Sequence, residues 1–121
     1  MILNNTDLAY AAGLLDGEGC ISLAHHVRPQ DRYVLQVSIA NTDYAVLAWL
    51  VELFGGSITK ANSNSNGLSM RPVWAWHTAS RISERVLALL LPYLRIKRRQ
   101  ADLALEFRRT FIGKGNRNGR G

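Results

Sequence analysis

The stretch AAGLLDGEGCI, residues 11–21, restricts the fold more than any other part of this chain. The longer segment DLAYAAGLLDG has apolar residues at helical spacing on every side. It predicts a helix that is capped by Asn5 or Thr6 and that ends at a left-handed Gly17 or Gly19. Because such a helix leaves no face for water, we expect it to be buried all round.

One stripe of this helix carries only the small residues Ala9, Gly13 and Gly17. Small residues let another backbone come close. Two partners fit this stripe: the same helix of a second copy in a two-fold dimer, or another element in the core of the same chain. The downstream end of the helix carries Asp16 and Glu18, where the negative pole of the helix repels carboxylates. We therefore expect a positive group near these two acids.

The length and composition are those of one globular domain. The chain has 121 residues, of which 47% are hydrophobic, and we assign residues 1–112 to the domain and the glycine-rich, basic residues 113–121 to a flexible tail. A single cysteine, Cys20, excludes an internal disulfide and favours a reducing compartment. No apolar run approaches the roughly 20 residues of a membrane helix, so we expect a soluble protein with no membrane partner.

The net charge of +6 is unevenly distributed. Residues 1–91 hold six basic and seven acidic side chains, whereas residues 92–121 hold nine basic and two acidic ones. This excess favours a polyanionic partner, although a solubilising tail explains it equally well.

Period-two alternation and helical spacing predict an αββαββα order followed by a terminal helix, which places the chain in the α+β class. After the first helix, the expected segments are the hairpin GCISLAHHV and RYVLQVSIA, the helix DYAVLAWLVELF, the hairpin GSITKAN and RPVWAWHTA, the helix SRISERVLALLLPYL and the helix ADLALEFRRTFI. We expect Asn41 or Thr42 to cap the second helix, Gly55 and Gly56 to end it, and Leu103 to help dock the last helix. Helices on one face of a curved, antiparallel four-stranded sheet leave the other face bare and polar, which suits a β-ribbon in the major groove of DNA.

Three stretches resemble one protein family in its order. AAGLLDGEG, residues 11–19, resembles the LAGLIDADG motif of homing endonucleases; LQVSIANTDYAVLAWLVELFGG resembles the second strand and helix of that family, and PYLRIKRRQADLALEF its late basic segment. Together they span most of residues 6–107. The resemblance implies the homing-endonuclease fold, double-stranded DNA as substrate, Mg²⁺ as the cofactor and no small-molecule cofactor.

The resemblance also implies how the chain assembles. In such enzymes the motif helices of two copies or two repeats pack together, and each delivers one acid to a shared site. Since this chain holds one motif, it implies a homodimer that makes a metal-dependent staggered double-strand break at a long pseudo-palindromic site. The residues implied for the dimer interface are Ala9, Ala12, Gly13, Asp16 and Gly17.

The same resemblance assigns the site. Glu18 is implied as the catalytic carboxylate that binds Mg²⁺, with the backbone carbonyl of Gly17 as a second ligand, and Asp16 as a structural residue. Lys97 matches the basic residue near the scissile phosphate, or is merely an exposed lysine. One departure is Ile39, which stands where the family often has a water-ordering glutamine.

Polar and basic residues on or near the bare sheet face are expected to read DNA. They are Ser22, His26, Arg28, Arg32, Gln36, Lys60, Asn62 and Arg71. Each alone is an ordinary solvated side chain, and only the set favours DNA. Two other functions stay open: a non-cleaving DNA-binding regulator or intron RNA maturase on the same scaffold, and, less favoured, a basic module bound to RNA or the ribosome.

Overall fold

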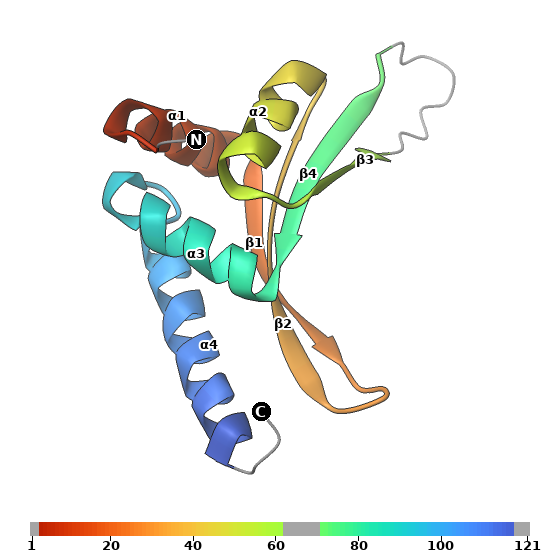
Figure 1. Cartoon of the computed structure of the whole chain (residues 1–121), viewed down its shortest axis with the longest axis vertical. Coiled ribbons are helices and arrows are strands. Elements are labelled where there is room, and N and C mark those ends of the chain that lie inside the picture. Colours follow the sequence, from red (N-terminus) through yellow and green to blue (C-terminus); the bar gives the residue numbers. More distant parts are fainter. Residues whose placement is uncertain (1–2, 62–70, 118–121) are drawn as a thin grey trace.

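The computed structural model describes residues 3–61 and 71–117, with side chains as far as residue 110. The elements are α1 (Asn5–Glu18), β1 (Gly19–His26), β2 (Arg32–Asn41), α2 (Tyr44–Phe54), β3 (Ser57–Ala61), β4 (Val73–Ala79), α3 (Ser80–Leu90), the 3-10 helix η1 (Leu91–Tyr93) and α4 (Arg98–Arg117) (Figure 1). This order confirms the predicted αββαββα arrangement and the α+β class.

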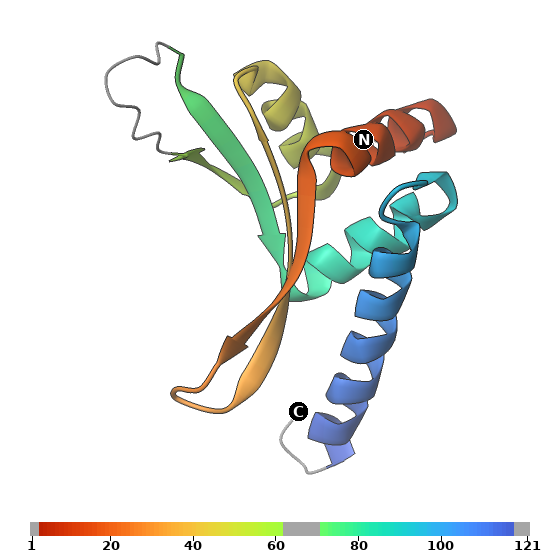
Figure 2. The ribbon, with the colours of Figure 1, turned by 180° about the vertical axis from the view of Figure 1, so that it is seen from behind.

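The four strands form one antiparallel sheet in the order β1-β2-β4-β3. Figures 1 and 2 show the helices gathered on one side of the curved sheet, which leaves its other face uncovered. We call this uncovered side the bare face. The predicted sheet and its single helical layer are therefore confirmed.

The core lies between the sheet and the helices, and Trp76 is its largest fully buried side chain, at 1% exposed. The indole Nε1 of Trp76 donates to the carbonyl of Gly55 over 2.8 Å. Gly55 and Gly56 have φ values of +93° and +92°, which L side chains rarely adopt, and a Cβ on Gly56 would lie 2.7 Å from the carbonyl oxygen of His77. The two glycines end α2 as predicted and let β3 approach β4.

The ends of α1 and the start of α2 differ from the prediction. The N-cap of α1 is Asn4, whose side chain accepts from the amide of Asp7, rather than Asn5 or Thr6. Gly17 lies inside the helix, and Gly19 has an extended backbone with φ −104° because the chain passes directly from α1 into β1. Likewise Asp43, not Asn41 or Thr42, caps α2.

The prediction that α1 is buried all round is wrong for a single chain. Leu8, Ala11, Ala12 and Leu15 face the core, because these four lie on one side of the helix. The opposite side is exposed, including Tyr10 at 59%.

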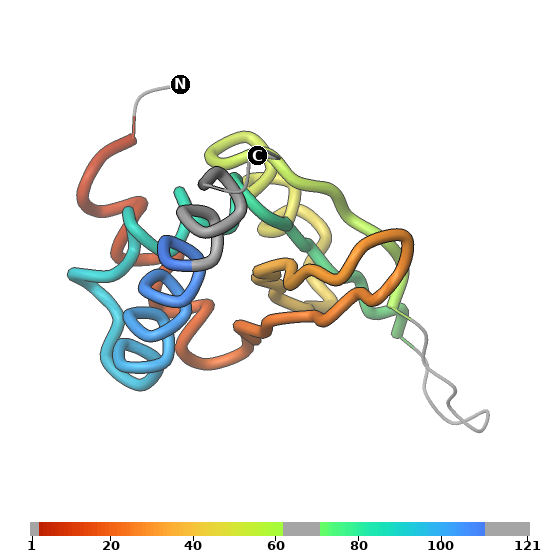
Figure 3. Tube along the Cα trace, turned by 90° about the horizontal axis from the view of Figure 1, so that it is seen from below, coloured from red at the N-terminus to blue at the C-terminus, as the bar shows by residue number. Residues whose placement is uncertain are grey.

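The docking of α4 also differs. Ala101 and Ala104 are buried against the core, while Leu103 is 53% exposed, since small residues let the helix approach more closely. Figure 3 shows α4 and the β1–β2 hairpin side by side, and the rings of Tyr33 and Phe107 bridge them with centroids 5.3 Å apart. The helix begins at Arg98 and extends past the predicted domain boundary at residue 112 to Arg117. The remaining residues of the predicted tail, 118–121, lie outside the described residues.

Candidate active site

The C-terminal end of α1 meets the segment between η1 and α4, which lies about 80 residues further along the chain. The two carboxylate oxygens of Asp16 accept hydrogen bonds from the backbone amides of Arg95, at 2.7 Å, and Lys97, at 2.9 Å. Asp16 therefore fastens the basic segment to the end of α1. This agrees with the structural role that the family resemblance implied for Asp16.

The pKa of Asp16 reflects these contacts. Burial acts to raise the pKa of the carboxyl, but hydrogen bonds from the backbone amides of Arg95, Lys97 and Ile96, together with the Lys97 charge, outweigh it. The net effect holds the pKa below its ordinary value. Asp16 is thus kept in the charged form that accepts two amide hydrogens.

Lys97 supplies a positive group where the sequence predicted one. Its Nζ donates to the backbone carbonyl of Asp16 over 2.8 Å. This carbonyl belongs to the last turn of α1, where carbonyls lack helical partners and carry the negative pole of the helix. Lys97 is consequently held against α1 at Asp16, which precedes Glu18 by two residues. It is not simply an exposed lysine.

Glu18 is exposed at the same end of α1, and one neighbouring amide orients it. The side-chain Nδ2 of Asn41 donates to Glu18 Oε1 over 2.7 Å. The Oδ1 of Asn41 accepts from the amide of Asp43, which leaves the NH₂ group to face the carboxylate. Ile39 is buried in the core at 1% exposed, so the polar group beside the acid comes from Asn41, two residues further along β2.

Among the described residues, no three His, Cys, Asp or Glu side chains come together as a possible metal group. One chain brings one exposed carboxylate, Glu18, to this end of α1.

The outward side of α1 carries the small-residue stripe. Ala9, Gly13 and Gly17 are exposed, and a Cβ built on either glycine would meet nothing within 4 Å. A hollow of about 530 Å³ borders this stripe, between Ala9 and Gly13 on α1 and Arg95 and Arg98 near the start of α4. Nothing within the described chain therefore requires a glycine at either position.

Among the residues predicted for a dimer interface, one is placed wrongly. Ala12 is 0% exposed and packs in the core of its own chain, because it lies on the side of α1 opposite the stripe. The other four lie on or beside the outward side, although the carboxylate of Asp16 is already engaged by backbone amides.

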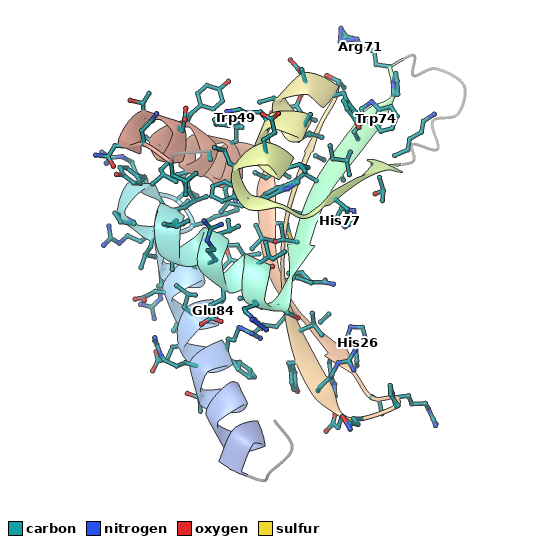
Figure 4. The ribbon with its side chains drawn as sticks, viewed as in Figure 1. His26, Trp49, Arg71, Trp74, His77 and Glu84 are labelled. Carbon is teal, nitrogen blue, oxygen red and sulfur yellow. The ribbon has the colours of Figure 1, made fainter. Side chains whose placement is uncertain are left out.

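The register of the strands places the predicted DNA-reading residues. Ser22, Gln36, His26 and Arg32 share the bare face, because Ser22 pairs with Gln36 and His26 with Arg32. Figure 4 shows His26 near the end of the β1–β2 hairpin and Arg71 at the opposite end of the sheet, just before β4. Arg28 lies in the turn between β1 and β2.

Lys60 does not belong to this set. It pairs with Trp74, which lies on the helical side of the sheet, and its Nζ is 5.9 Å from the centre of the Trp74 ring. Lys60 was predicted to lie on the bare face, and this prediction is wrong. Successive residues of a strand point to opposite sides of the sheet, and Lys60 points to the helical side. Asn62, also predicted, lies outside the described residues.

Sequence reasoning did not select His77, which occupies the centre of the bare face (Figure 4). His77 pairs with Ser38 on one side and Ser57 on the other, and its Nε2 is 3.1 Å from Thr59 Oγ1. A hollow of about 460 Å³ at this place includes Ser22, Gln36 and His77 in its lining. The alternation of VWAWHTA, with tryptophans on the other face, was the signal that could have identified His77.

Solved structures share this fold. The homing endonuclease I-CvuI, crystallised with its DNA target in the presence of Ca, superposes with a TM-score of 0.75 over 90% of this chain and 69% of that chain, at 22% identity. The archaeal intron-encoded homing endonuclease I-Vdi141I, complexed with DNA, gives 0.71 over 90% and 70%, at 17% identity. The meganuclease I-SmaMI, bound to uncleavable DNA, gives a TM-score of 0.72 over 93% of this chain and 39% of that longer chain, at 15% identity.

At these identities the comparison establishes the fold: the chain has the fold of homing endonucleases. Comparisons with protein-family profiles and with curated proteins find no match. In the described part of the chain, no helix has the length and apolar character needed to cross a membrane.

Proposed function

We propose that this protein is a site-specific DNA endonuclease of the homing type, which acts as a homodimer and makes a metal-dependent staggered break in a long pseudo-palindromic site. The observation that carries the proposal is the exposed Glu18 at the end of α1, oriented by Asn41 and lying beside a fixed Lys97. This arrangement stands on a fold shared with homing endonucleases that were crystallised with DNA.

The donor atoms near Glu18 fit a hard divalent cation. A carboxylate and a backbone carbonyl supply oxygen ligands, which Mg²⁺ prefers, and the negative pole of α1 adds a favourable field. Glu18 and the carbonyl of Gly17 would hold the ion. When bound, such an ion stabilises charge on a phosphoryl group and activates water. Asn41 orients Glu18, and the ammonium group of Lys97 stabilises negative charge that develops near the helix end.

The homodimer brings two such sites together. Each chain supplies one exposed acid at the end of α1, and cutting both strands needs one at each strand. Gly13 and Gly17 support an approach through α1, because a glycine inside a helix costs about 1 kcal/mol relative to alanine and nothing in its own chain requires it. A second copy of α1 packed against this stripe would explain why both positions are glycine.

The test is cleavage of a library of long DNA duplexes, with and without Mg²⁺. We expect staggered double-strand products that need the metal and that disappear in Glu18→Gln while DNA binding persists. The matched control is Glu52→Gln, which removes another exposed acid on α2 and should cleave normally. Lys97→Met should lower the single-turnover rate without changing the site that is cut.

Two outcomes would contradict the proposal. Cleavage that survives Glu18→Gln would show that the acid is misassigned. Specific DNA binding by the unaltered protein, with no cleavage in Mg²⁺ or Mn²⁺, would identify a non-cleaving DNA-binding protein on the same scaffold.

A further inference from the structure

The strand register divides the bare face into rows that cross the sheet. The first row, beside Glu18, contains Cys20, Ser38, His77 and Ser57, and the second contains Ser22, Gln36 and Ala79. Further toward the turn at residues 27–31, the third row is the pair Ala24 and Val34, and the fourth is the pair His26 and Arg32. The first row crosses all four strands, and the last two belong to the β1–β2 hairpin alone. Distance from Glu18 therefore increases row by row.

The Ala24–Val34 row differs from its neighbours. Both side chains are apolar and only partly buried, whereas the neighbouring pairs of the hairpin are the polar Ser22–Gln36 and His26–Arg32. An uncovered face of an antiparallel sheet normally carries polar side chains. An apolar pair held between a Gln36 row and an Arg32 row is thus a feature that packing within the chain does not explain.

The spacing of the rows matches DNA. Residues on one face of a strand are two apart, which is about 6.8 Å along the strand. Because DNA rises about 3.4 Å for each base pair, successive rows meet base pairs that are about two steps apart. In the major groove, glutamine suits adenine, arginine suits guanine, and an apolar side chain suits the C5-methyl group of thymine.

We propose that the bare face reads its DNA target row by row at intervals of about two base pairs, and that Ala24 and Val34 select a thymine. The order is fixed by the chain: β1 begins at Gly19, directly after Glu18, so among the rows of Gln36, Val34 and Arg32 the Gln36 row lies nearest the cleaved centre. The Val34 row reads about two base pairs further out, and the Arg32 row about two beyond that. This inference rests on the proposed DNA-binding function and adds the base preferences of each half-site.

The distribution of charge on the bare face supports base reading by the inner rows. In the three rows that contain Gln36, Val34 and Arg32, the permanent positive charge is that of Arg32, at the outer end. Phosphate contacts position a protein on DNA, whereas base edges specify the sequence. Neutral inner rows can therefore discriminate between bases without a competing anchor to the phosphates.

The first experiment selects bound duplexes from a randomised library, using the unaltered chain and the variants Gln36→Ala, Val34→Ala and Arg32→Ala. We expect each variant to lose its preference at one position in each half-site, and these positions to run outward from the centre in the order of the three rows. The Val34→Ala position should be a thymine in the unaltered chain. Relaxed positions in another order, or no thymine position sensitive to Val34→Ala, would overturn the row model.

The second experiment alters the DNA and leaves the protein unchanged. Deoxyuridine in place of that thymine removes only the C5-methyl group and should weaken binding by about fourfold, the value of one buried methyl group. Val34→Ala should bind both duplexes within twofold, and deoxyuridine at a thymine outside the sensitive positions is the control. Equal binding of both duplexes by the unaltered chain would refute thymine selection.

Failure of DNA reading and failure of the row model give different results. If the library yields no enriched site at all, the DNA-reading function itself is wrong. If a site is enriched but ignores the rows, the endonuclease proposal stands and the row model alone is wrong.

Discussion

Gly13→Ala separates what a single chain needs from what a dimer needs. A Cβ at Gly13 would meet nothing within 4 Å, so the added methyl group creates no clash inside the chain. Alanine in a helix interior is favoured over glycine by about 1 kcal/mol. The isolated chain should therefore become more stable by about 1 kcal/mol, which corresponds to a rise in Tm of about 4 °C for a domain of this size.

The dimer should respond in the opposite sense. If α1 packs against α1 of a second copy through this stripe, each copy inserts a methyl group where two backbones come close. Overpacking of this kind costs about 1–3 kcal/mol, so the dimer should dissociate about 5- to 150-fold more readily. Sedimentation equilibrium gives the dissociation constant, and thermal unfolding well below that concentration gives the stability of the single chain.

A glycine elsewhere provides the control. Gly55 has φ +93°, and Gly55→Ala should destabilise the chain by about 1–2 kcal/mol without changing the stability of the dimer, because its cost is conformational. A dimer contact through the Gly13 stripe is refuted if Gly13→Ala destabilises the single chain, or if it stabilises the chain and leaves the dimer unchanged.

Three further substitutions test the site and the bare face. Asn41→Ala should lower the single-turnover cleavage rate by about 10- to 100-fold, as for loss of a residue that orients a ligand, while DNA binding changes by less than twofold. The lowered pKa of Asp16 means that its stabilising contribution is present above its unfolded pKa and is lost as pH falls through the lower folded value; on acidification below about pH 4, Tm should therefore drop more in the unaltered chain than in Asp16→Asn. Arg28→Ala, in the turn between β1 and β2, should reduce the slope of log affinity against log salt by about one, whereas Lys60→Ala, on the helical side of the sheet, should leave it unchanged; equal slopes for the two variants would place the DNA elsewhere.

The sequence predicted the elements better than their mutual placement. Alternation in GCISLAHHV and RYVLQVSIA was enough to set the faces of the first hairpin, because a short turn fixes its register. The second hairpin has a longer connection, which does not set how β3 lines up with β4, and Lys60 was consequently assigned to the wrong face. The partners of Asp16 could not be derived either, since Arg95 and Lys97 approach it only through the tertiary fold.

Burial was predictable for the strands and less so for the helices. A strand has two faces, so one buried residue fixes the rest, whereas the phase of a helix depends on the residues that it meets. For this reason Ala12, which was predicted for the dimer interface, lies in the core. Leu103, which was predicted to dock α4, is exposed because Ala101 and Ala104 dock the helix instead.

The two acids at the end of α1 have different roles: Asp16 stabilises the chain, and Glu18 is the proposed metal ligand. Asp16 accepts two backbone amides and holds Lys97 in place, so its charge is satisfied within the chain. Glu18 faces solvent with one amide from Asn41 and lies at the negative pole of the helix, where an anion is disfavoured by about 0.3–1 kcal/mol. Glu18→Gln keeps an oxygen for Asn41 and removes that repulsion, so Tm should rise by a few degrees while cleavage is lost. A fall in Tm would mean that the carboxylate stabilises the chain by itself, and the strain that a bound cation is expected to relieve would not exist.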